Sequence, residues 1–238
     1  RSRGLGDVYK RQQLRSVSLC RNILRALSAG SLPPLEAYPK AQVVTFRYYT
    51  GRLALLDEEY ARAEAELGAA FAGSPRWAER QRERILVYLV PVRLLHGVRP
   101  AAALLDAFPR IAQLYAPLLD AYARGDVRAY DAALEEPERE RTLVRLGVFV
   151  ALERAREGCM ARLFRRVWAV SGRPTRMRFD AFWQALRWLG VPVEREEAEW
   201  FLAGAIARGL MKGYLAHERQ TLVLSAKEPF PRVAVAGI

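Results

Sequence analysis

The stretch from 209 to 225 constrains the fold of this 238-residue chain more than any other part of the sequence. Residues 210–217 alternate between two faces, the residues at 222–224 are Leu, Val and Leu, and Glu218, Arg219 and Gln220 lie between the two runs. Two short β-prone runs around a polar connection predict a β-hairpin, although the connection lacks an Asn-Gly or Asp-Gly pair. A single hairpin cannot bury a face alone, so we expect it to pack on the preceding helices.

Three helices are predicted directly before this hairpin, over residues 159–171, 178–189 and 194–208. The second places four apolar residues in helical register. These are Phe179, Phe182, Leu186 and Leu189. Gly172 and Pro174 mark the first connecting loop, and Gly190 and Pro192 mark the second. Three helices closed by a hairpin predict a winged helix.

The sequence upstream of residue 159 is predicted to be a series of helices. Their ranges are 14–29, 41–56, 58–72, 76–95, 115–124, 127–135 and 138–156, with shorter helices separated by Pro100, Pro109 and Pro117. We expect Asp57 and Asp126 to cap the N-termini of the helices that follow them. The pattern predicts a mostly α-helical fold: a right-handed, tetratricopeptide-like helical-repeat solenoid that runs into the winged helix.

The predicted helices 41–56 and 58–72 have a sequence pattern typical of a helical-repeat hairpin. The apolar stripe expected to face inward is Phe46, Tyr49, Leu53 and Leu56. The small residues expected to allow close approach of the two helices are Gly51, Ala54 and Ala63.

Four segments follow from this pattern. Residues 1–12 lack useful periodicity and resemble translated sequencing adapter, so we exclude them from the fold and expect the natural protein to extend upstream. Residues 13–158 form the solenoid, 159–226 the winged helix and 227–238 a C-terminal tail. Gly158 is the only helix breaker at the main boundary, which predicts that solenoid and winged helix form one rigid body.

The net charge of +12 favours a polyanionic partner, either nucleic acid or an acidic protein. The segment 1–12 carries four basic residues and one acid, so without it the net charge falls to +9. An Arg-rich composition with abundant Ala and Leu can equally reflect a GC-rich genome.

No motif for catalysis or for a cofactor is found. His96 and His217 lie far apart in the sequence, and neither Cys20 nor Cys159 has a Cys or His neighbour that would suggest a metal site. Phosphate loops, dinucleotide-binding glycines and Gly-x-Ser-x-Gly are absent from the sequence. The longest uninterrupted apolar run, 85–92, is too short to span a bilayer. We therefore expect a protein that is not an enzyme, with no metal, cofactor or membrane partner.

The charge of the predicted winged helix is polarised. Residues 159–189 carry seven arginines and one acid, Asp180, whereas six acids balance six basic residues from 190 onward. The candidate nucleic-acid-binding residues are Arg162, Arg165, Arg166, Arg173, Arg176, Arg178, Arg187 and Lys212. The third helix begins with acids, which disfavours base readout by that helix. We expect sequence-independent phosphate contacts instead, unless these arginines are simply solvated or bind an acidic protein.

Protein docking is expected at the hairpin edge and the neighbouring helices. The candidate partner-binding residues are Trp183, Trp200, Tyr214, Leu222 and Leu224. Trp183 falls off the apolar stripe of its helix, and an exposed Trp would indicate a protein-binding anchor.

Several stretches, in order along the chain, resemble one known family. They are Cys-Arg-Asn-Ile-Leu-Arg-Ala at 20–26, Tyr-Tyr-Thr-Gly-Arg-Leu-Ala at 48–54, Arg-Ile-Leu-Val-Tyr-Leu-Val-Pro-Val-Arg at 84–93, Arg-Leu-Phe-Arg-Arg-Val at 162–167, Met-Lys-Gly-Tyr-Leu-Ala-His at 211–217 and Glu-Pro-Phe-Pro at 228–231. Together they resemble the PCI-domain subunits of nuclear transcription-and-mRNA-export complexes, over residues 14–231. Signalosome-associated PCI proteins share these motifs.

This resemblance implies a nuclear, non-enzymatic scaffold, with some of the protein at the nuclear pore or in the cytoplasm. It implies that the winged helix docks a large PCI-like export scaffold, and that the chain binds a small acidic protein shared with the proteasome lid. It also implies a basic platform for RNA or DNA, to which Arg162, Arg165, Arg166 and Lys212 correspond. The alternative is a purely protein-binding PCI scaffold of a signalosome, proteasome-lid or initiation-factor type complex.

Overall fold

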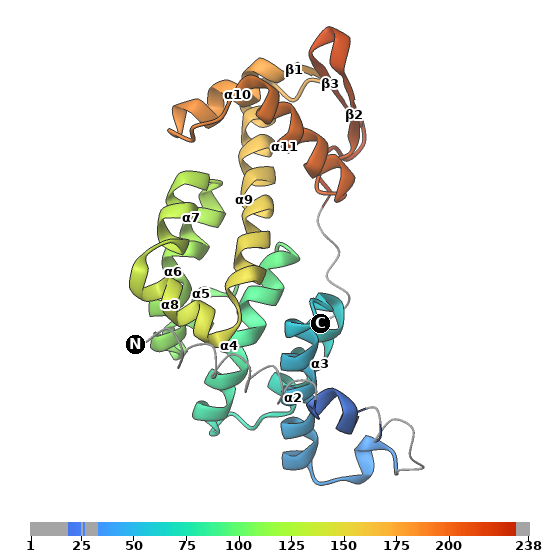
Figure 1. The fold of residues 1–238 in the computed structure, drawn as a ribbon, viewed down its shortest axis with the longest axis vertical. Coiled ribbons are helices and arrows are strands. Elements are labelled where there is room, and N and C mark those ends of the chain that lie inside the picture. The colour runs from blue at the N-terminus through green and yellow to red at the C-terminus, as the bar shows by residue number, and fades with distance from the viewer. Residues whose placement is uncertain (1–18, 25, 27–32, 232–238) are drawn as a thin grey trace, which may run out of the picture. The chain divides into compact units, whose positions relative to one another are not determined.

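The computed structural model describes residues 19–24, 26 and 33–231 of the chain. The predicted adapter segment 1–12 and the end of the predicted tail, 232–238, lie outside these residues. The described fold is mostly helical, with a small antiparallel sheet near the C-terminus (Figure 1). Contacts divide the chain into two compact units, Arg1–Ile85 and Leu86–Ile238, which we describe separately. The division falls inside helix α4 (Glu79–Leu95).

The first unit is built on the pair α2 (Lys40–Leu56) and α3 (Tyr60–Gly73), preceded by the 3-10 turn η1 (Leu35–Ala37). The two helices pack closely because small residues lie between them. Ala54 and Ala63 are buried, and a Cβ on Gly51 would lie 2.7 Å from the Leu67 side chain. The close approach predicted from these small residues is confirmed.

The apolar stripe predicted for α2 is wrong. Phe46, Tyr49 and Leu56 are exposed. The buried residues of α2 are Val44, Tyr48, Thr50, Gly51, Ala54 and Leu55. The small residues select the face that meets α3, whereas the prediction followed the larger apolar side chains. Asp57 was expected to cap α3, but it is the C-cap of α2 and pairs with Arg21.

The second unit continues with five helices after α4. They are α5 (Ala102–Ala107), α6 (Pro109–Arg124), α7 (Val127–Leu134), α8 (Pro137–Leu146) and α9 (Phe149–Val170). The predicted start of α6 at 115 is wrong, because Pro117 lies inside the helix. Gly125 ends α6 in the left-handed conformation, and the Asp126 side chain accepts a hydrogen bond from the Ala129 N–H at 2.9 Å, as expected for an N-cap.

The predicted helix 138–156 is also wrong, because Gly147 ends α8 with a φ of 75°. Helix α9 then runs without interruption through Gly158, where the sequence predicted a break between solenoid and winged helix. A glycine is present at this position because of the packing against α6, where a Cβ at Gly158 would collide with the ring and hydroxyl of Tyr122. Gly158 is therefore needed for close packing rather than for a helix end, and the predicted boundary at 158 lies inside a single helix.

The sheet lies at the C-terminal end of the second unit, beside α10 (Phe179–Trp188) and α11 (Arg195–Ala207) (Figure 1). Its strands are β1 (Arg176–Arg178), β2 (Gly213–Ala216) and β3 (Thr221–Leu224), in the order β1-β3-β2 and antiparallel. The predicted hairpin is confirmed as β2 and β3, with Leu215 opposite Leu222. Strand β1 was not predicted, because three residues are too few to show a periodicity.

Residues 229–231 pack against the rest of the second unit, although they were predicted to belong to a tail. The Lys212 N–H donates to the Pro229 carbonyl at 2.7 Å, and the Phe230 ring lies 5.5 Å from that of Trp168. Met177, Leu222 and Leu224 add apolar side chains to the core of this region.

Gly158→Ala tests the packing between α6 and α9. The added Cβ must displace Tyr122, so we expect a loss of about 1–3 kcal/mol in the free energy of unfolding, measured by urea denaturation. Gly204→Ala in α11 is the matched control, since no atom lies within 4 Å of its Cβ position. The control should gain up to about 1 kcal/mol from the higher helix propensity of alanine. Equal effects of the two changes would contradict the packing role of Gly158.

Candidate functional site

The three predicted arginines of α9 have different environments. Arg162 is half-buried: its Nη2 donates to the Gly97 carbonyl at 3.0 Å, and its guanidinium lies 4.7 Å from the centre of the Tyr122 ring. Arg166 is exposed, but its Nη1 donates to the carbonyl of Arg124 at the C-terminus of α6. Arg165 is exposed and forms no ion pair with the described residues. Two of the three arginines therefore stabilise the packing of α9 on its neighbours.

The predicted arginines around β1 are exposed. Arg176 and Arg178 flank the buried Met177, so strand alternation sends both side chains to the outer face. Arg178 pairs with Asp180, with Nη2 and Oδ2 3.2 Å apart. Arg173 lies in the preceding turn with a φ of 58°, and its guanidinium is 5.9 Å from the centre of the Trp168 ring.

The two remaining basic candidates lie on other elements. Arg187 is exposed on α10 and stacks over Trp183, 4.9 Å from its ring centre. Lys212 pairs with Glu228 at 3.1 Å. Four of the eight basic candidates, Arg165, Arg173, Arg176 and Arg187, are exposed and have no side-chain hydrogen bond or ion pair with a described residue. The other four, Arg162, Arg166, Arg178 and Lys212, are hydrogen-bonded or ion-paired within the second unit.

The predicted partner-binding residues divide into buried and exposed sets. Leu222 and Leu224 are 0% and 4% exposed, so they belong to the core and their assignment to a docking surface is wrong. They lie on the central strand β3, whose alternate residues face the helices, whereas the sheet edges are β1 and β2. Trp183 is half-buried, and its indole N–H donates to the Val193 carbonyl at 3.1 Å.

Trp200 and Tyr214 are the exposed members of the predicted partner-binding set, with exposed fractions of 77% and 62%. Sequence reasoning missed Trp188, which is 86% exposed at the end of α10. The sequence signal that could have predicted its exposure is that Trp188 lies off the apolar stripe of Phe179, Phe182 and Leu186.

A groove of about 620 Å³ lies between α9 and α11. Trp200, Phe201 and Ala205 line it from α11, and Met160 and Phe164 line it from α9. Its charged lining residues carry both signs. They are Glu153, Arg154, Arg156, Glu157 and Arg208. Among them, Arg156 forms a bidentate pair with Asp131, at 2.6 and 2.8 Å, and Arg208 pairs with Glu157. We call this apolar hollow with its mixed-charge rim the α9–α11 groove.

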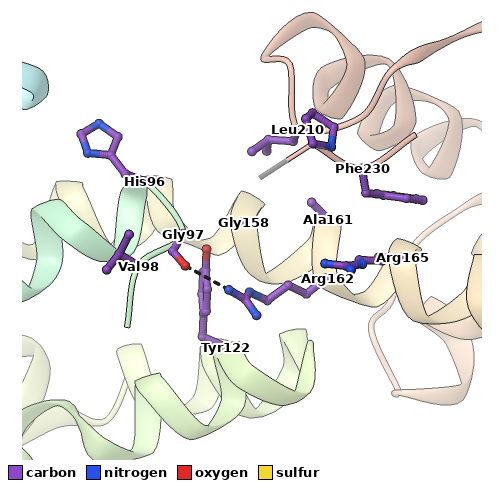
Figure 2. Close-up of a pocket in the computed structure, with 11 residues that line it drawn as sticks. His96, Gly97, Val98, Tyr122, Gly158, Ala161, Arg162, Arg165, Leu210 and Phe230 are labelled. Atoms are coloured by element: carbon purple, nitrogen blue, oxygen red, sulfur yellow. Dashed lines mark hydrogen bonds between the residues drawn. The ribbon is translucent and has the colours of Figure 1, made fainter. Parts of the chain in front are cut away.

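A second hollow, of about 410 Å³, lies elsewhere along α9, and we call it the α9 pocket (Figure 2). Its cationic or potentially cationic lining residues are His96, Arg162 and Arg165. None of the described residues that line it carries a carboxylate. Figure 2 shows Arg162 extended from α9 towards the Gly97 carbonyl, with Tyr122 beside it.

Burial governs the ionisable groups beneath the α9 pocket. It raises the pKa of the Tyr122 hydroxyl, an effect that the nearby Arg162 opposes. It also raises the pKa of the Cys159 thiol to about 12. The thiol is therefore protonated at neutral pH and is not a candidate nucleophile. These groups support the fold rather than catalysis.

Among residues 19–24, 26 and 33–231, no group of three or more His, Cys, Asp or Glu side chains is placed to hold a metal ion. Within the same residues, none of the helices is both long and apolar enough to cross a membrane.

Comparisons with known proteins find similar sequences over most of this chain. The chain is 43% identical over 246 residues to the protein CSN12 homolog of Mycosarcoma maydis, covering 98% of this chain and 54% of the relative. It is 31% identical over 220 residues to PCI domain-containing protein 2 of Xenopus laevis, covering 92% of this chain and 53% of the relative. No family model matches.

These similarities, with a mostly helical fold that ends in a small antiparallel sheet, support a PCI-domain protein. The chain is also similar to enhanced ethylene response protein 5 of Arabidopsis thaliana, with 32% identity over 226 residues, 93% of this chain and 56% of the relative. The chain spans about half the length of the curated relatives it matches.

His217 connects the hairpin to α11 and provides a test of this region. Its Nδ1 lies 2.8 Å from a carboxylate oxygen of Glu199, and this hydrogen bond raises the pKa of the imidazole. We expect Glu199→Gln to return the His217 pKa towards the ordinary value of about 6.5, as measured by an NMR titration.

The corresponding effect on stability has a defined sign. Because the folded-state pKa of His217 is raised, its contribution is complete below the unfolded-state pKa and is lost as the pH rises through the folded-state pKa. The wild-type protein should therefore exceed Glu199→Gln in stability at about pH 5.5 by more than at about pH 8.5. An unchanged His217 pKa in the variant would show that the contact does not form in solution.

Proposed function

We propose that this chain is a non-enzymatic PCI scaffold, in which a helical-repeat solenoid leads into a winged helix formed by α9, α10, α11 and the sheet. The second unit docks a partner protein in a multisubunit complex of the signalosome type. The similarity to CSN12 homologues supports this kind of assembly. The single observation that carries the docking role is Trp200, which is largely exposed at the rim of an apolar groove.

Trp200 has the properties of an interface anchor. A largely exposed Trp next to an apolar hollow gains much more from burial against a partner than a polar surface residue would. The groove supplies the apolar floor, through Met160, Phe164 and Phe201. Its rim carries Glu157 and Arg208, already paired with each other, so a partner need not neutralise an excess of one charge.

The surroundings of the groove favour a rigid docking surface. Arg156 and Asp131 fasten α9 to α7, and Gly158 allows α9 to pack closely on α6. A partner that binds α9 and α11 therefore meets helices that are held by their own core, and it orders few side chains on binding. The exposed edge strand β2, with Tyr214 on its surface, extends the proposed interface towards the sheet.

The test is purification of the tagged protein from its own cells, with mass spectrometry of the proteins that elute with it in size-exclusion chromatography. We expect PCI-domain proteins in stoichiometric amounts, with recovery unchanged by nuclease. Trp200→Ala should lower their recovery by at least about tenfold, because truncation of a central aromatic anchor commonly costs about 2 kcal/mol or more of binding free energy. Trp77→Ala, an equally large truncation of an exposed tryptophan in the first unit, is the matched control.

Full recovery of the partners by Trp200→Ala would contradict the role of the groove. Loss of the partners on nuclease treatment would contradict direct protein docking and would favour the second candidate.

The second candidate is a nuclear mRNA-export scaffold that contributes a basic surface for RNA or DNA, beside a large PCI-like partner and a small acidic protein shared with the proteasome lid. The exposure of Arg165, Arg173 and Arg176 favours it. The internal partners of Arg162, Arg166 and Lys212 weigh against it, since a phosphate would have to compete with them.

Fluorescent single-stranded RNA, titrated with the protein at several salt concentrations, tests this candidate. Phosphate contacts predict binding that weakens steeply with salt. A triple change of Arg165, Arg173 and Arg176 to Gln should abolish it. The charge-matched control changes the exposed residues Arg76, Arg80 and Arg141 to Gln. Equal losses in the two variants would show that only the net charge matters and would contradict a defined surface.

A further inference from the structure

The α9 pocket has a charge and a construction that protein docking does not explain. Arg162 and Arg165 belong to one face of α9, three residues apart, and the segment after α4 contributes His96 to the lining. No carboxylate of the described residues forms an ion pair with Arg162 or Arg165 or lines the pocket. Arg99, exposed three residues after His96, acts electrostatically on Tyr122 and adds a further positive charge to this region.

Arg162 is held in a fixed position within the pocket. One of its N–H groups donates to the Gly97 carbonyl at 3.0 Å, and its guanidinium carbon lies 4.7 Å from the centre of the Tyr122 ring. A guanidinium has five N–H donors, so donors remain for a ligand after these contacts. An arginine whose position is already set by protein contacts loses little conformational freedom on binding an anion.

The remaining wall of the pocket is apolar and comes from the C-terminal part of the chain. Leu210, Phe230 and Pro231 line it. The backbone hydrogen bond between Lys212 and Pro229 and the contact of Phe230 with Trp168 hold this wall in place. The pocket is thus a bounded hollow with a cationic side and an apolar side, unlike the open surface around β1.

We propose that the α9 pocket binds a small phosphorylated molecule, whose phosphate is held by Arg162 and Arg165 and whose remaining part lies against Phe230 and Pro231. Arginine suits this ligand because its planar array of donors matches phosphate oxygens in bidentate geometry. A volume of about 410 Å³ accommodates a phosphate with a compact organic group, not a long polymer. Binding would connect α9, α6, the segment after α4 and the C-terminal wall, and would stabilise their packing.

The test is isothermal titration calorimetry of the full chain with inorganic pyrophosphate, against sodium chloride of matched ionic strength. We expect saturable binding with one site per chain, and no saturable signal from chloride. Arg165→Gln should weaken binding by at least about tenfold, since a charge-assisted hydrogen bond to phosphate is lost. Arg187→Gln, which removes an exposed arginine on α10 outside the pocket, should bind as the wild type does.

Arg162→Lys provides a second variant, in which the charge stays but the planar donor array is lost. Its folding is checked by circular dichroism, and it should also bind pyrophosphate more weakly. Absence of saturable binding by the wild type, or equal weakening in Arg165→Gln and Arg187→Gln, would overturn the proposal. Displacement of pyrophosphate by single-stranded RNA with a 5′-hydroxyl end would also overturn it, because the pocket would then be part of a contact to a nucleic-acid backbone.

Discussion

The second unit depends on the close contact between Gly158 of α9 and Tyr122 of α6. Helix α9 has 22 residues, and it can pack along α6 only because Gly158 leaves room for a large aromatic ring. That ring in turn supports Arg162, which reaches past it to the Gly97 carbonyl. One missing side chain thus positions the helix that lines both the α9–α11 groove and the α9 pocket.

The two hollows of α9 differ in chemistry, and this difference separates their proposed roles. The α9–α11 groove has an apolar floor, an exposed Trp200 and rim charges of both signs, which suit a protein partner. The α9 pocket combines two arginines with an apolar wall and no lining carboxylate among the described residues, which suits a small anion. A protein partner and a small ligand would therefore contact the same helix through different side chains.

The sequence predicted elements whose signals are local. The hairpin followed from its two β-prone runs, the end of α6 and start of α7 from Gly125 and Asp126, and the α2–α3 contact from small residues such as Gly51. The predictions from sequence were wrong where the structure of a segment depends on residues that are distant along the chain. The sequence around Gly158 predicts a helix break, because it does not show that Tyr122 lies against this glycine. Leu222 was likewise predicted to lie at a sheet edge, because the sequence does not show that β1 pairs with β3 on that side. The site was only partly predictable for the same reason: sequence gives the charge of Arg162 but not its bond to Gly97.

The central claim is that the second unit binds a protein through α9 and α11. Amide hydrogen exchange of the chain, alone and within the complex purified from its cells, tests this claim directly. The account predicts slower exchange on assembly in residues 150–160 and 200–208, with residues 173–178 unchanged. Slower exchange confined to 173–178, reversed by nuclease, would contradict it and would indicate that nucleic acid covers the basic surface around β1.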